Sequence, residues 1–336
     1  MRDPSTLPTL ILRWQNLPQA IHCGRPPPMA QRVTDEFIDR AEQMAESGCS
    51  REEADALCRG LTAQHYENFP VLSRLLPEPQ RGDLCAIYAF ARLADDFADE
   101  ARYHGQRAEM LGLWRARLLE AAEGDHAHPV FKALADVMRR CRISPRLLER
   151  LIDAFEQDTR VTRYETWDEL IDYCSRSADP VGRTVLRIFG HEDDEMDQQS
   201  DAICTALQLA NHWQDIGQDL GRDRIYVPRE MMRRFGVTEE ALFDRLVTPA
   251  FEDMMRVCVR RAWRLFDRGR PLAGKVDRPL RRWIRLVWLG GTTILRRIEG
   301  RNFDTLTGRP TLSRSDKVML AARGLFIGRL PRTPML

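Results

Sequence analysis

Apolar residues recur at steps of three and four along almost the whole chain, and this spacing constrains the fold more than any other feature. Such steps bring side chains to one face of an α-helix, whereas a half-buried strand needs alternation of apolar and polar residues. Alternating runs that would indicate strands are nearly absent. The sequence therefore predicts an all-α protein in which helices bury their apolar faces in a common core.

Prolines and capping residues divide this pattern into segments of ordinary length. Pro145, Pro180 and Pro249 stand where the start of a helix tolerates proline. Ser50 precedes Arg-Glu-Glu, as an N-cap precedes an acidic first turn, and Pro70 ends the segment that follows. The predicted helices cover residues 34–47, the segment from 50 to 68, 80–100, 106–123, 129–141, 144–157, 166–176, 180–189, 194–220, 238–246, 249–269, 278–299 and 313–323.

No internal repeat and no long low-complexity linker interrupts the helical pattern. We therefore expect a single all-α domain over residues 29–325, which is long enough to bury one large core. Residues 1–28 end in a Pro-Pro-Pro run that breaks any helix, and we expect them to be a disordered tail or a mis-assigned start. Residues 326–336 are expected to form a C-terminal tail.

The composition excludes several functions. The 336 residues carry 51 basic and 50 acidic side chains, a net charge of +1, so the basic excess typical of nucleic-acid-binding proteins is missing. No apolar run approaches the roughly 20 residues that span a bilayer. The eight cysteines are scattered without a CxxC pair, which favours reduced thiols over a zinc site. For His126 and His128, in a polar stretch between glycine and proline, we expect a solvated loop rather than a metal clip.

Two short acidic segments lie inside sequence that otherwise predicts helix. They are Asp95–Glu100 (DDFADE) and Asn211–Asp219 (NHWQDIGQD). Each repeats its polar side chains every four residues, which advances the helix face by only about 40°. Asp95 and Asp99 are therefore expected on one face, and so are Asn211, Asp215 and Asp219. Two such faces brought together would make a cage of oxygen atoms suited to Mg²⁺ and a diphosphate.

A solvated helix surface is the plainer explanation for either acidic segment alone, but the residues that precede each segment argue against it. Residues 84–91 are apolar almost without interruption, and further apolar residues between 202 and 210 lead into Asn211. A helix that is apolar nearly all round is buried, and buried carboxylates without partners cost on the order of several kcal/mol each. A divalent cation is the simplest partner, and oxygen ligands without histidine or cysteine favour Mg²⁺ over Zn²⁺.

Arginines and aromatic residues surround the two segments. Arg92 precedes Asp95, and Arg222 and Arg224 follow the second segment; each is either a surface residue or a fork for phosphate oxygens. No P-loop or GxGxxG pattern points to a nucleotide. An apolar cavity that ends at magnesium and diphosphate points to isoprenoid diphosphates, whose carbocations are stabilised by aromatic faces. Candidates to line it, each of which could instead belong to the core, are Phe69, Tyr88, Phe90, Tyr173, Val181, Leu207 and Trp213.

Taken together, these motifs resemble the squalene/phytoene synthase family of head-to-head isoprenoid synthases, over roughly residues 60 to 315. The resemblance implies an isoprenoid-synthase fold, which is a helical bundle around a central cavity. The matching segments are His65–Pro70, Tyr88–Arg92, the pair Asp95 and Asp99, Tyr173–Cys174, Val181–Gly182, Gln208–Asp219 and Asp223–Pro228.

The resemblance also implies roles for individual residues. The cofactor that it implies is Mg²⁺, and the positions that match metal ligands are Asp95, Asp99, Asn211, Asp215 and Asp219. The four aspartates among them are the catalytic candidates. Positions that match substrate contacts are Arg92, Arg224 and Tyr226 for the diphosphate, Gln208 as a polar pocket residue, and Phe69, Tyr88, Tyr173 and Val181 as pocket lining. Arg309 is a looser match to a late phosphate-binding arginine.

One departure from the family pattern points to a branch within it. Squalene and phytoene synthases tend to follow Tyr-Cys with a small apolar stretch, whereas this chain has the polar run Ser175–Arg183. That version, together with Tyr66–Pro70, is similar to the bacterial hydroxysqualene synthases of hopanoid biosynthesis. This resemblance implies that presqualene diphosphate is the substrate and that water captures its cation. No nicotinamide-binding motif is visible, which agrees with water rather than hydride.

Two other functions stay open from the sequence. One is the condensation of two prenyl diphosphates to presqualene diphosphate, squalene or phytoene, and the other is a non-catalytic helical assembly protein that keeps a relic of the site. We expect a cytoplasmic protein. Residues 321–331 mix basic and apolar side chains as an interfacial segment does, so a peripheral contact with the inner membrane face stays open beside an ordinary packed or frayed C-terminus. The oligomeric state is not fixed by the sequence.

Overall fold

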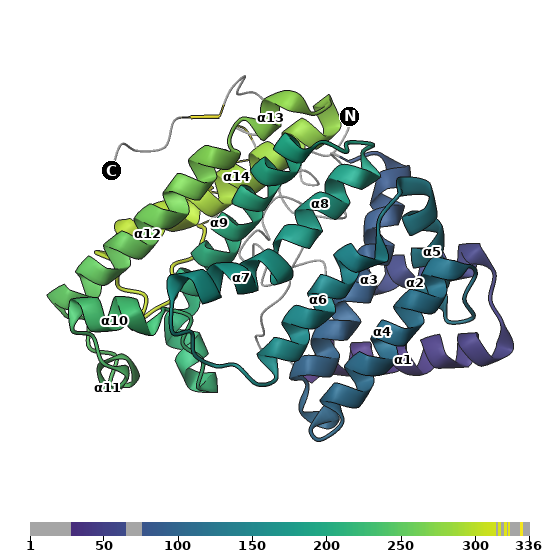
Figure 1. The fold of residues 1–336 in the computed structure, drawn as a ribbon, viewed down its shortest axis with the longest axis horizontal. Helices are drawn as coiled ribbons and strands as arrows, with labels where there is room; N and C mark the ends of the chain where they lie inside the picture. Colours follow the sequence, from purple (N-terminus) through teal and green to yellow (C-terminus); the bar gives the residue numbers. More distant parts are fainter. Residues whose placement is uncertain are drawn as a thin grey trace, which may run out of the picture. The chain divides into compact units, whose positions relative to one another are not determined.

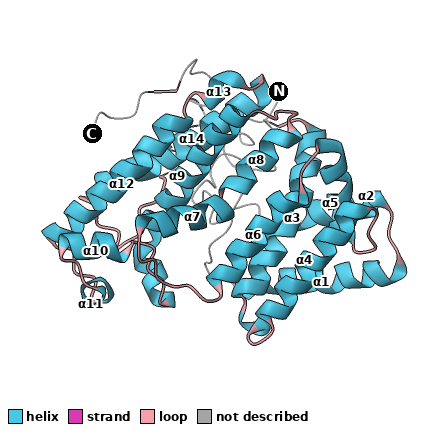
Figure 2. Cartoon of the chain, in the orientation of Figure 1, coloured by secondary structure: helices cyan, strands magenta, loops and turns pink. Residues whose placement is uncertain are grey.

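The computed structural model describes residues 28–64 and 76–313, together with residues 315–316, 319–320, 322 and 330–331 (Figure 1). In this part of the chain every regular element is a helix, apart from one isolated bridge between Arg163 and Ile225 (Figure 2). The prediction of an all-α protein is confirmed. None of the helices in the described ranges is both long enough and apolar enough to cross a membrane.

The elements follow one another with short connections. In chain order they are α1 (Pro28–Ser47), α2 (Arg51–Gln64), α3 (Glu78–Asp99), η3 (Ala101–Tyr103), α4 (Arg107–Glu123), α5 (Pro129–Cys141), α6 (Pro145–Asp158), α7 (Trp167–Ser177), α8 (Asp179–Ile188), α9 (Asp194–Asp219), η4 (Leu220–Arg222), α10 (Arg229–Phe235), α11 (Glu239–Phe243), α12 (Pro249–Gly269), α13 (Leu272–Lys275) and α14 (Arg278–Glu299).

Most helices begin and end where prolines and capping residues predict. Pro145 and Pro249 occupy the first turn of α6 and α12, where an N–H group has no partner within the helix anyway. Thr248 caps α12 by accepting a hydrogen bond from a backbone amide at 3.2 Å. α8 begins at Asp179, one residue before Pro180. The short helices α10 and α13 are absent from the sequence prediction, because one or two turns are too few for an apolar period to show.

Several predictions fall outside the described residues. These are the tail before Pro28, the part of the 50–68 segment beyond Gln64, Phe69, and most of the tail over 326–336. Of the predicted helix over 313–323, the described residues 315–316, 319–320 and 322 are helical.

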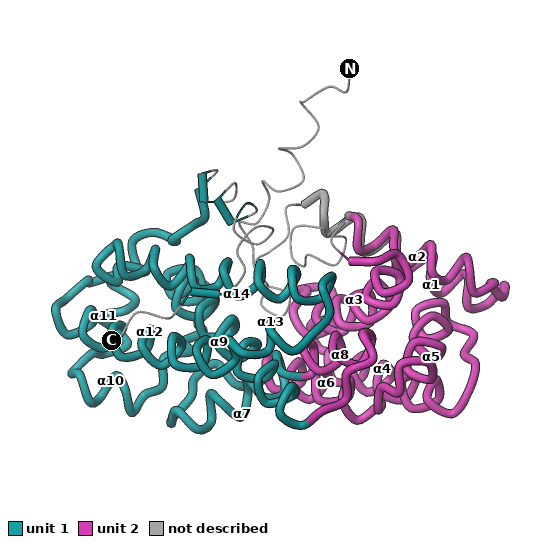
Figure 3. Tube along the Cα trace, turned by 90° about the horizontal axis from the view of Figure 1, so that it is seen from above, with its two compact units in different colours: residues 1–18, 161–179, 194–336 teal, residues 19–160, 180–193 magenta. Residues whose placement is uncertain are grey.

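The chain divides into two compact units, which Figure 3 colours separately. Unit 1 contains residues 161–179 and, from Asp194 onward, the helices α9 to α14. Unit 2 contains α1 to α6 and residues Pro180–Asp193, which form most of α8. Whether the two units act as one domain, as we expect from the sequence, stays a prediction.

Unit 1 is built on α9, which is buried on nearly all sides and packs against α7, α12, α13 and α14. A close approach occurs at Gly291 of α14, where an added Cβ would lie 2.5 Å from Phe266 Cζ and 2.6 Å from Leu207 Cδ2. Glycine at this position lets α14 lie against both α9 and α12. Leu207, a candidate to line a cavity, is therefore packed between helices.

Unit 2 is built on α3, which packs against α2, α4, α5 and α6. Its residues from Leu84 to Phe90 are all buried, as their continuous apolar run predicts. The ring of Phe90 lies 6.1 Å from those of Trp114 and Phe131, and its carbonyl oxygen accepts a hydrogen bond from Trp114 Nε1 at 3.1 Å. The acidic segment at the C-terminal end of α3 therefore continues from a well-packed core.

Candidate active site

The first acidic segment forms the last turns of α3 in unit 2. Asp95 and Asp96 are 6% and 2% exposed, and Asp99 is half-buried. Arg92, one turn earlier, contacts both buried carboxylates: Nη2 lies 2.5 Å from Asp96 Oδ1 and Nη1 lies 3.7 Å from Asp95 Oδ2. A solvated surface, the plainer explanation from the sequence, is therefore excluded for Asp95 and Asp96.

Asp96 is not among the predicted site residues, yet it is strongly perturbed. Burial raises the pKa of Asp96 to about 7, the charge of Arg92 opposes this, and the nearby carboxylates of Asp95 and Glu100 raise it further. Its Oδ2 atom is buried without a hydrogen-bond partner. The pairing with Arg92 therefore does not fully compensate the carboxylate of Asp96, and a further cation would be favourable here.

The second acidic segment forms the C-terminal end of α9 in unit 1. Asn211, Asp215 and Asp219, at successive turns, are 8%, 6% and 9% exposed, and Gln208 is also buried. Asp215 pairs with Arg309, whose Nε donates to Oδ1 and whose Nη2 lies 3.2 Å from Oδ2. The structure thus joins Asp215 to the arginine that the sequence matched only loosely.

The pKa of Asp219 indicates that the positive charge near this end of α9 does not balance its carboxylates. Burial raises the pKa of Asp219 to about 8, and the carboxylate of Asp215 raises it as well. Arg222, Arg224 and Arg309 lower it, but less than burial raises it. A buried carboxylate beside another keeps a proton unless a stronger source of positive charge is present.

A segment after α9 carries Arg224 and Tyr226, and Arg163 anchors its start. Arg163 Nη1 donates to the carbonyl oxygen of Asp223, and its Nη2 lies 2.6 Å from Asp223 Oδ1. Asp223 has a φ of 56°, in the left-handed region that aspartate enters more readily than most residues. Arg224 N then donates to Asp219 O at 3.0 Å. These contacts fix the backbone of Arg224 to the end of α9.

Tyr226 belongs to a buried aromatic cluster. Its ring stacks on His212 with 3.7 Å between centroids, and the rings of Tyr164 and Tyr173 lie 5.8 and 6.3 Å away. Burial lowers the pKa of His212 to about 3, so its imidazole is neutral. The structure thus brings together the predicted residues Tyr173 and Tyr226. It adds His212 and Tyr164, which no sequence pattern marks, because a lone ring in a helix or loop is most often part of the core.

The other predicted pocket residues have different surroundings. Tyr88 is buried on α3, Val181 is half-buried on α8, and Phe69 lies outside the described residues. Phe90 and Trp213 are completely buried, the former among the aromatic rings of the unit 2 core. These two residues serve the core, an alternative that the sequence left open.

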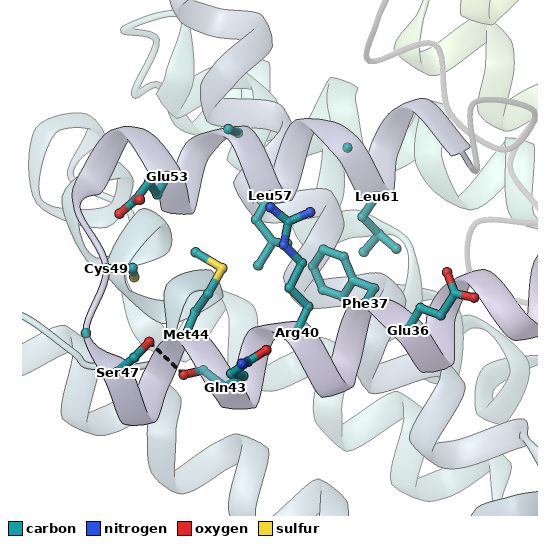
Figure 4. A pocket seen from close by; sticks show the side chains of 13 residues that line it. Glu36, Phe37, Arg40, Gln43, Met44, Ser47, Cys49, Glu53, Leu57 and Leu61 are labelled. Carbon is teal, nitrogen blue, oxygen red and sulfur yellow. Dashed lines mark hydrogen bonds between the residues drawn. The ribbon is translucent and has the colours of Figure 1, made fainter.

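A groove of ≈ 650 Å³ lies between α1 and α2 in unit 2 (Figure 4). Among the residues that line it, Phe37, Leu57 and Leu61 are buried, whereas Glu36 and Arg40 are exposed. None of the predicted site residues lines this groove.

The two helix ends offer carboxylate and amide oxygens, which are the donors that Mg²⁺ prefers. Within the described residues, no three His, Cys, Asp or Glu side chains gather closely enough to hold a metal ion unaided. Mg²⁺ commonly binds one or two carboxylates, while waters and substrate phosphates complete its coordination. The raised pKa values of Asp96 and Asp219 agree with a nearby cation, and the buried oxygen donors Asp95, Asn211, Asp215 and Asp219 fit Mg²⁺ bound together with a diphosphate.

The cysteines and histidines, which are other common metal ligands, have different surroundings. The cysteines of the described ranges are free thiols: Cys49, Cys58, Cys85, Cys141, Cys174, Cys204 and Cys258. The expectation of a solvated loop is wrong for His128, which is 3% exposed and packs edge-on against Trp114 and Phe131. Pro129 starts α5 directly after it, and this draws His128 into the core of unit 2.

The helical fold and the two buried acidic helix ends agree with an all-α isoprenoid synthase, which is the fold of a solved structure at 41% identity. Residues 62–316 match the family described as squalene/phytoene synthase. Because this match spans more than half of the chain, the protein belongs to the squalene/phytoene synthase family.

Individual relatives agree with this family. A hydroxysqualene synthase of Rhodopseudomonas palustris is 37% identical over 212 residues, which cover 62% of this chain and 71% of the relative. A hydroxysqualene synthase of Sinorhizobium fredii is 40% identical over 183 residues, 54% of this chain and 61% of the relative, so less than two thirds of that protein is spanned. The crystal structure of a squalene synthase of Alicyclobacillus acidocaldarius has a TM-score of 0.73 and 41% identity, and covers 77% of this chain and 99% of its own.

Proposed function

We propose that this protein is a hydroxysqualene synthase, which converts presqualene diphosphate and water to hydroxysqualene and diphosphate in hopanoid biosynthesis. Family membership supports a prenyl diphosphate as substrate. The relatives named hydroxysqualene synthase, at 37% and 40% identity, support this branch of the family. The structural observation that carries the proposal is the burial of aspartates, without sufficient positive charge, at the ends of both α3 and α9.

In this proposal both acidic segments serve one substrate. The residues proposed to hold Mg²⁺ with the substrate diphosphate are Asp95, Asp99, Asn211, Asp215 and Asp219. Bound Mg²⁺ supplies positive charge that stabilises the departing diphosphate.

Arginines would hold the diphosphate oxygens directly. Arg92 and Arg309 already contact carboxylates, and Arg224 is fixed by its backbone to the end of α9. A guanidinium forms two parallel hydrogen bonds to a phosphate as readily as to a carboxylate. Arg92 and Arg309 would therefore exchange a carboxylate for a phosphate oxygen when the substrate binds, and Tyr226 would add a hydroxyl.

The chemistry needs no redox partner. The bond between carbon and the diphosphate oxygen breaks, and its electron pair leaves with the diphosphate. The resulting cyclopropylcarbinyl cation rearranges, the oxygen of a water molecule forms a new bond to carbon, and that water loses a proton. Tyr88 and Tyr173 are the aromatic residues proposed to stabilise the cation, and Val181 and Gln208 are further proposed substrate contacts. Phe69, proposed with them, lies outside the described residues.

The test supplies purified protein with presqualene diphosphate or farnesyl diphosphate separately, with and without NADPH, in ¹⁸O-labelled water. The expected result is consumption of presqualene diphosphate alone, without dependence on NADPH, to an alcohol that carries ¹⁸O. Formation of presqualene diphosphate from farnesyl diphosphate, or of squalene only with NADPH, would assign the protein to a sister activity. Failure to bind Mg²⁺ and diphosphate together would favour the non-catalytic alternative.

A cytoplasmic location with a peripheral contact at the inner membrane face belongs to the same proposal, because the product is almost entirely hydrocarbon. Most of residues 321–331, the candidate interfacial segment, lie outside the described residues. Co-sedimentation with anionic phospholipid vesicles tests the contact. Equal binding by a chain that ends at residue 320 would show that this segment has no part in it.

A further inference from the structure

A strap of chain after α14, residues Asp304–Leu312, lies along α9 without belonging to any helix. Leu306 and Leu312 are completely buried, so the strap is packed into unit 1. The strap carries Arg309, whose guanidinium pairs with Asp215. The position of that guanidinium therefore depends on what holds the strap in register with α9.

Two hydrogen bonds join the strap directly to α9. Gly217 N donates to Thr305 O at 3.2 Å, and Gln214 Nε2 donates to Pro310 O at 2.5 Å. The approach is close enough to require glycine, since a Cβ on Gly217 would lie 2.6 Å from Leu306 O and 3.0 Å from Thr305 O. The strap backbone thus rests on the α9 backbone between the turns of Asp215 and Asp219.

Arg245 links the same two backbones from a third element. Its Nη2 donates to Gly217 O at 2.9 Å and its Nη1 donates to Leu306 O at 2.5 Å. Gly217 O is one of the last four carbonyls of α9, which have no amide partner within the helix. Arg245 follows α11 with a φ of 55°, in a left-handed conformation that is uncommon for a residue other than glycine.

We propose that Arg245 is a positioning residue for the active site. By donating to a carbonyl of α9 and a carbonyl of the strap at once, it holds the strap in the register that places the Arg309 guanidinium beside Asp215. Its effect on catalysis rests on the proposed function, because Arg309 matters to turnover only if it meets the substrate diphosphate. The guanidinium suits this task, since its nitrogens form a rigid planar fork that can bridge two carbonyls at a fixed spacing.

The test combines Arg245→Met, Arg309→Met and the double variant, with Arg268→Met as a control that removes an exposed arginine of α12. Turnover is measured with presqualene diphosphate, and binding of inorganic diphosphate is measured calorimetrically with Mg²⁺ present. Arg245→Met should lower kcat/KM by about 10²-fold, the loss expected when a positioned group moves by about 1 Å. The control should match the wild-type protein.

The double variant separates positioning from a general structural effect. If Arg245 acts through Arg309, the double variant should lose no more kcat/KM or diphosphate affinity than Arg309→Met alone. Losses that multiply would overturn the proposal. If Arg245→Met does not fold, Gly217→Ala disturbs the same contact between α9 and the strap from the side of α9. Combined with Arg309→Met, it should lower kcat/KM and diphosphate affinity no further than Arg309→Met alone.

Hydrogen–deuterium exchange gives a readout that does not depend on the reaction. Amides of the strap should exchange faster in Arg245→Met than in the wild-type protein, while those of α12 should not change. Unchanged protection of the strap would overturn the role of Arg245 even in an active enzyme. If the wild-type protein neither turns over presqualene diphosphate nor binds diphosphate, the proposed function fails, and the exchange rates alone decide whether Arg245 holds the strap.

Discussion

Replacing His128 by glutamine should make the stability of this protein less sensitive to acid. His128 lies 5.5 Å from the rings of both Trp114 and Phe131, and its Nε2 is 3.8 Å from Glu42 Oε1. Burial lowers the pKa of His128 to about 3, and the charges of Arg117 and His126 lower it as well, whereas Glu42 raises it. The imidazole is therefore neutral in the folded protein.

The sign of this pH dependence follows from the pH at which His128 is protonated in the folded and in the unfolded protein. The unfolded chain protonates His128 near its ordinary pKa of 6.5, whereas the folded protein does so only near 3, so acid favours the unfolded state between these values. The free energy of unfolding therefore falls as pH drops below 6.5. For this one group the loss is about 1 kcal/mol at about pH 5.5, and it grows as the pH falls toward 3.

Urea unfolding at about pH 7.5 and about pH 5.5 measures this difference. The loss between the two pH values should be about 1 kcal/mol smaller in His128→Gln than in the wild-type protein. His104→Gln, which removes an exposed histidine, is the control. The same loss in His128→Gln and in the wild-type protein would refute the burial of a neutral imidazole.

Three further predictions concern the site and the core. Asp95→Asn and Asp215→Asn should each lower turnover by about 10²-fold or more without changing the far-ultraviolet circular dichroism. The control Asp194→Asn, at the exposed start of α9, should retain activity. Activity near the wild-type level in Asp95→Asn or Asp215→Asn would contradict the assigned role. Gly291→Ala should lower the free energy of unfolding by about 1 to 3 kcal/mol in urea titrations, because the added methyl group overlaps the side chains of α9 and α12. Exhaustive chelation with EDTA should abolish turnover and Mg²⁺ should restore it, so an active chelated enzyme would exclude the metal.

The helices were largely predictable because the signals that specify them are local. An apolar period and a proline at the first turn identify α12 without knowledge of any other helix. The burial of Asp95 and Asp215 was predictable for a related reason, since each follows an apolar run that only a buried helix explains. The roles of Phe90 and Trp213 were not predictable, because large aromatic residues are found both in the packed core and in the wall of an apolar cavity.

The pairing within the site depended on the fold. Arg309 lies 94 residues from Asp215, and Arg245 lies 28 residues from Gly217 and 61 from Leu306. No short-range spacing predicts such contacts, because they exist only where a strap and two helices pack in one register. His128 is a similar case, since its loop is polar in sequence and the aromatic rings that bury it come from α4 and α5.

The sequence by itself determined an all-α chain with oxygen ligands repeated every four residues at the ends of two buried helices, because helical period and spacing are properties of neighbouring residues. Only the tertiary structure decided that Arg309 is the partner of Asp215 and that Arg245 donates hydrogen bonds to both the strap and α9. The physical reason is that these contacts join segments far apart in the chain, and their distances are set by the packing of helices within unit 1 rather than by any local preference.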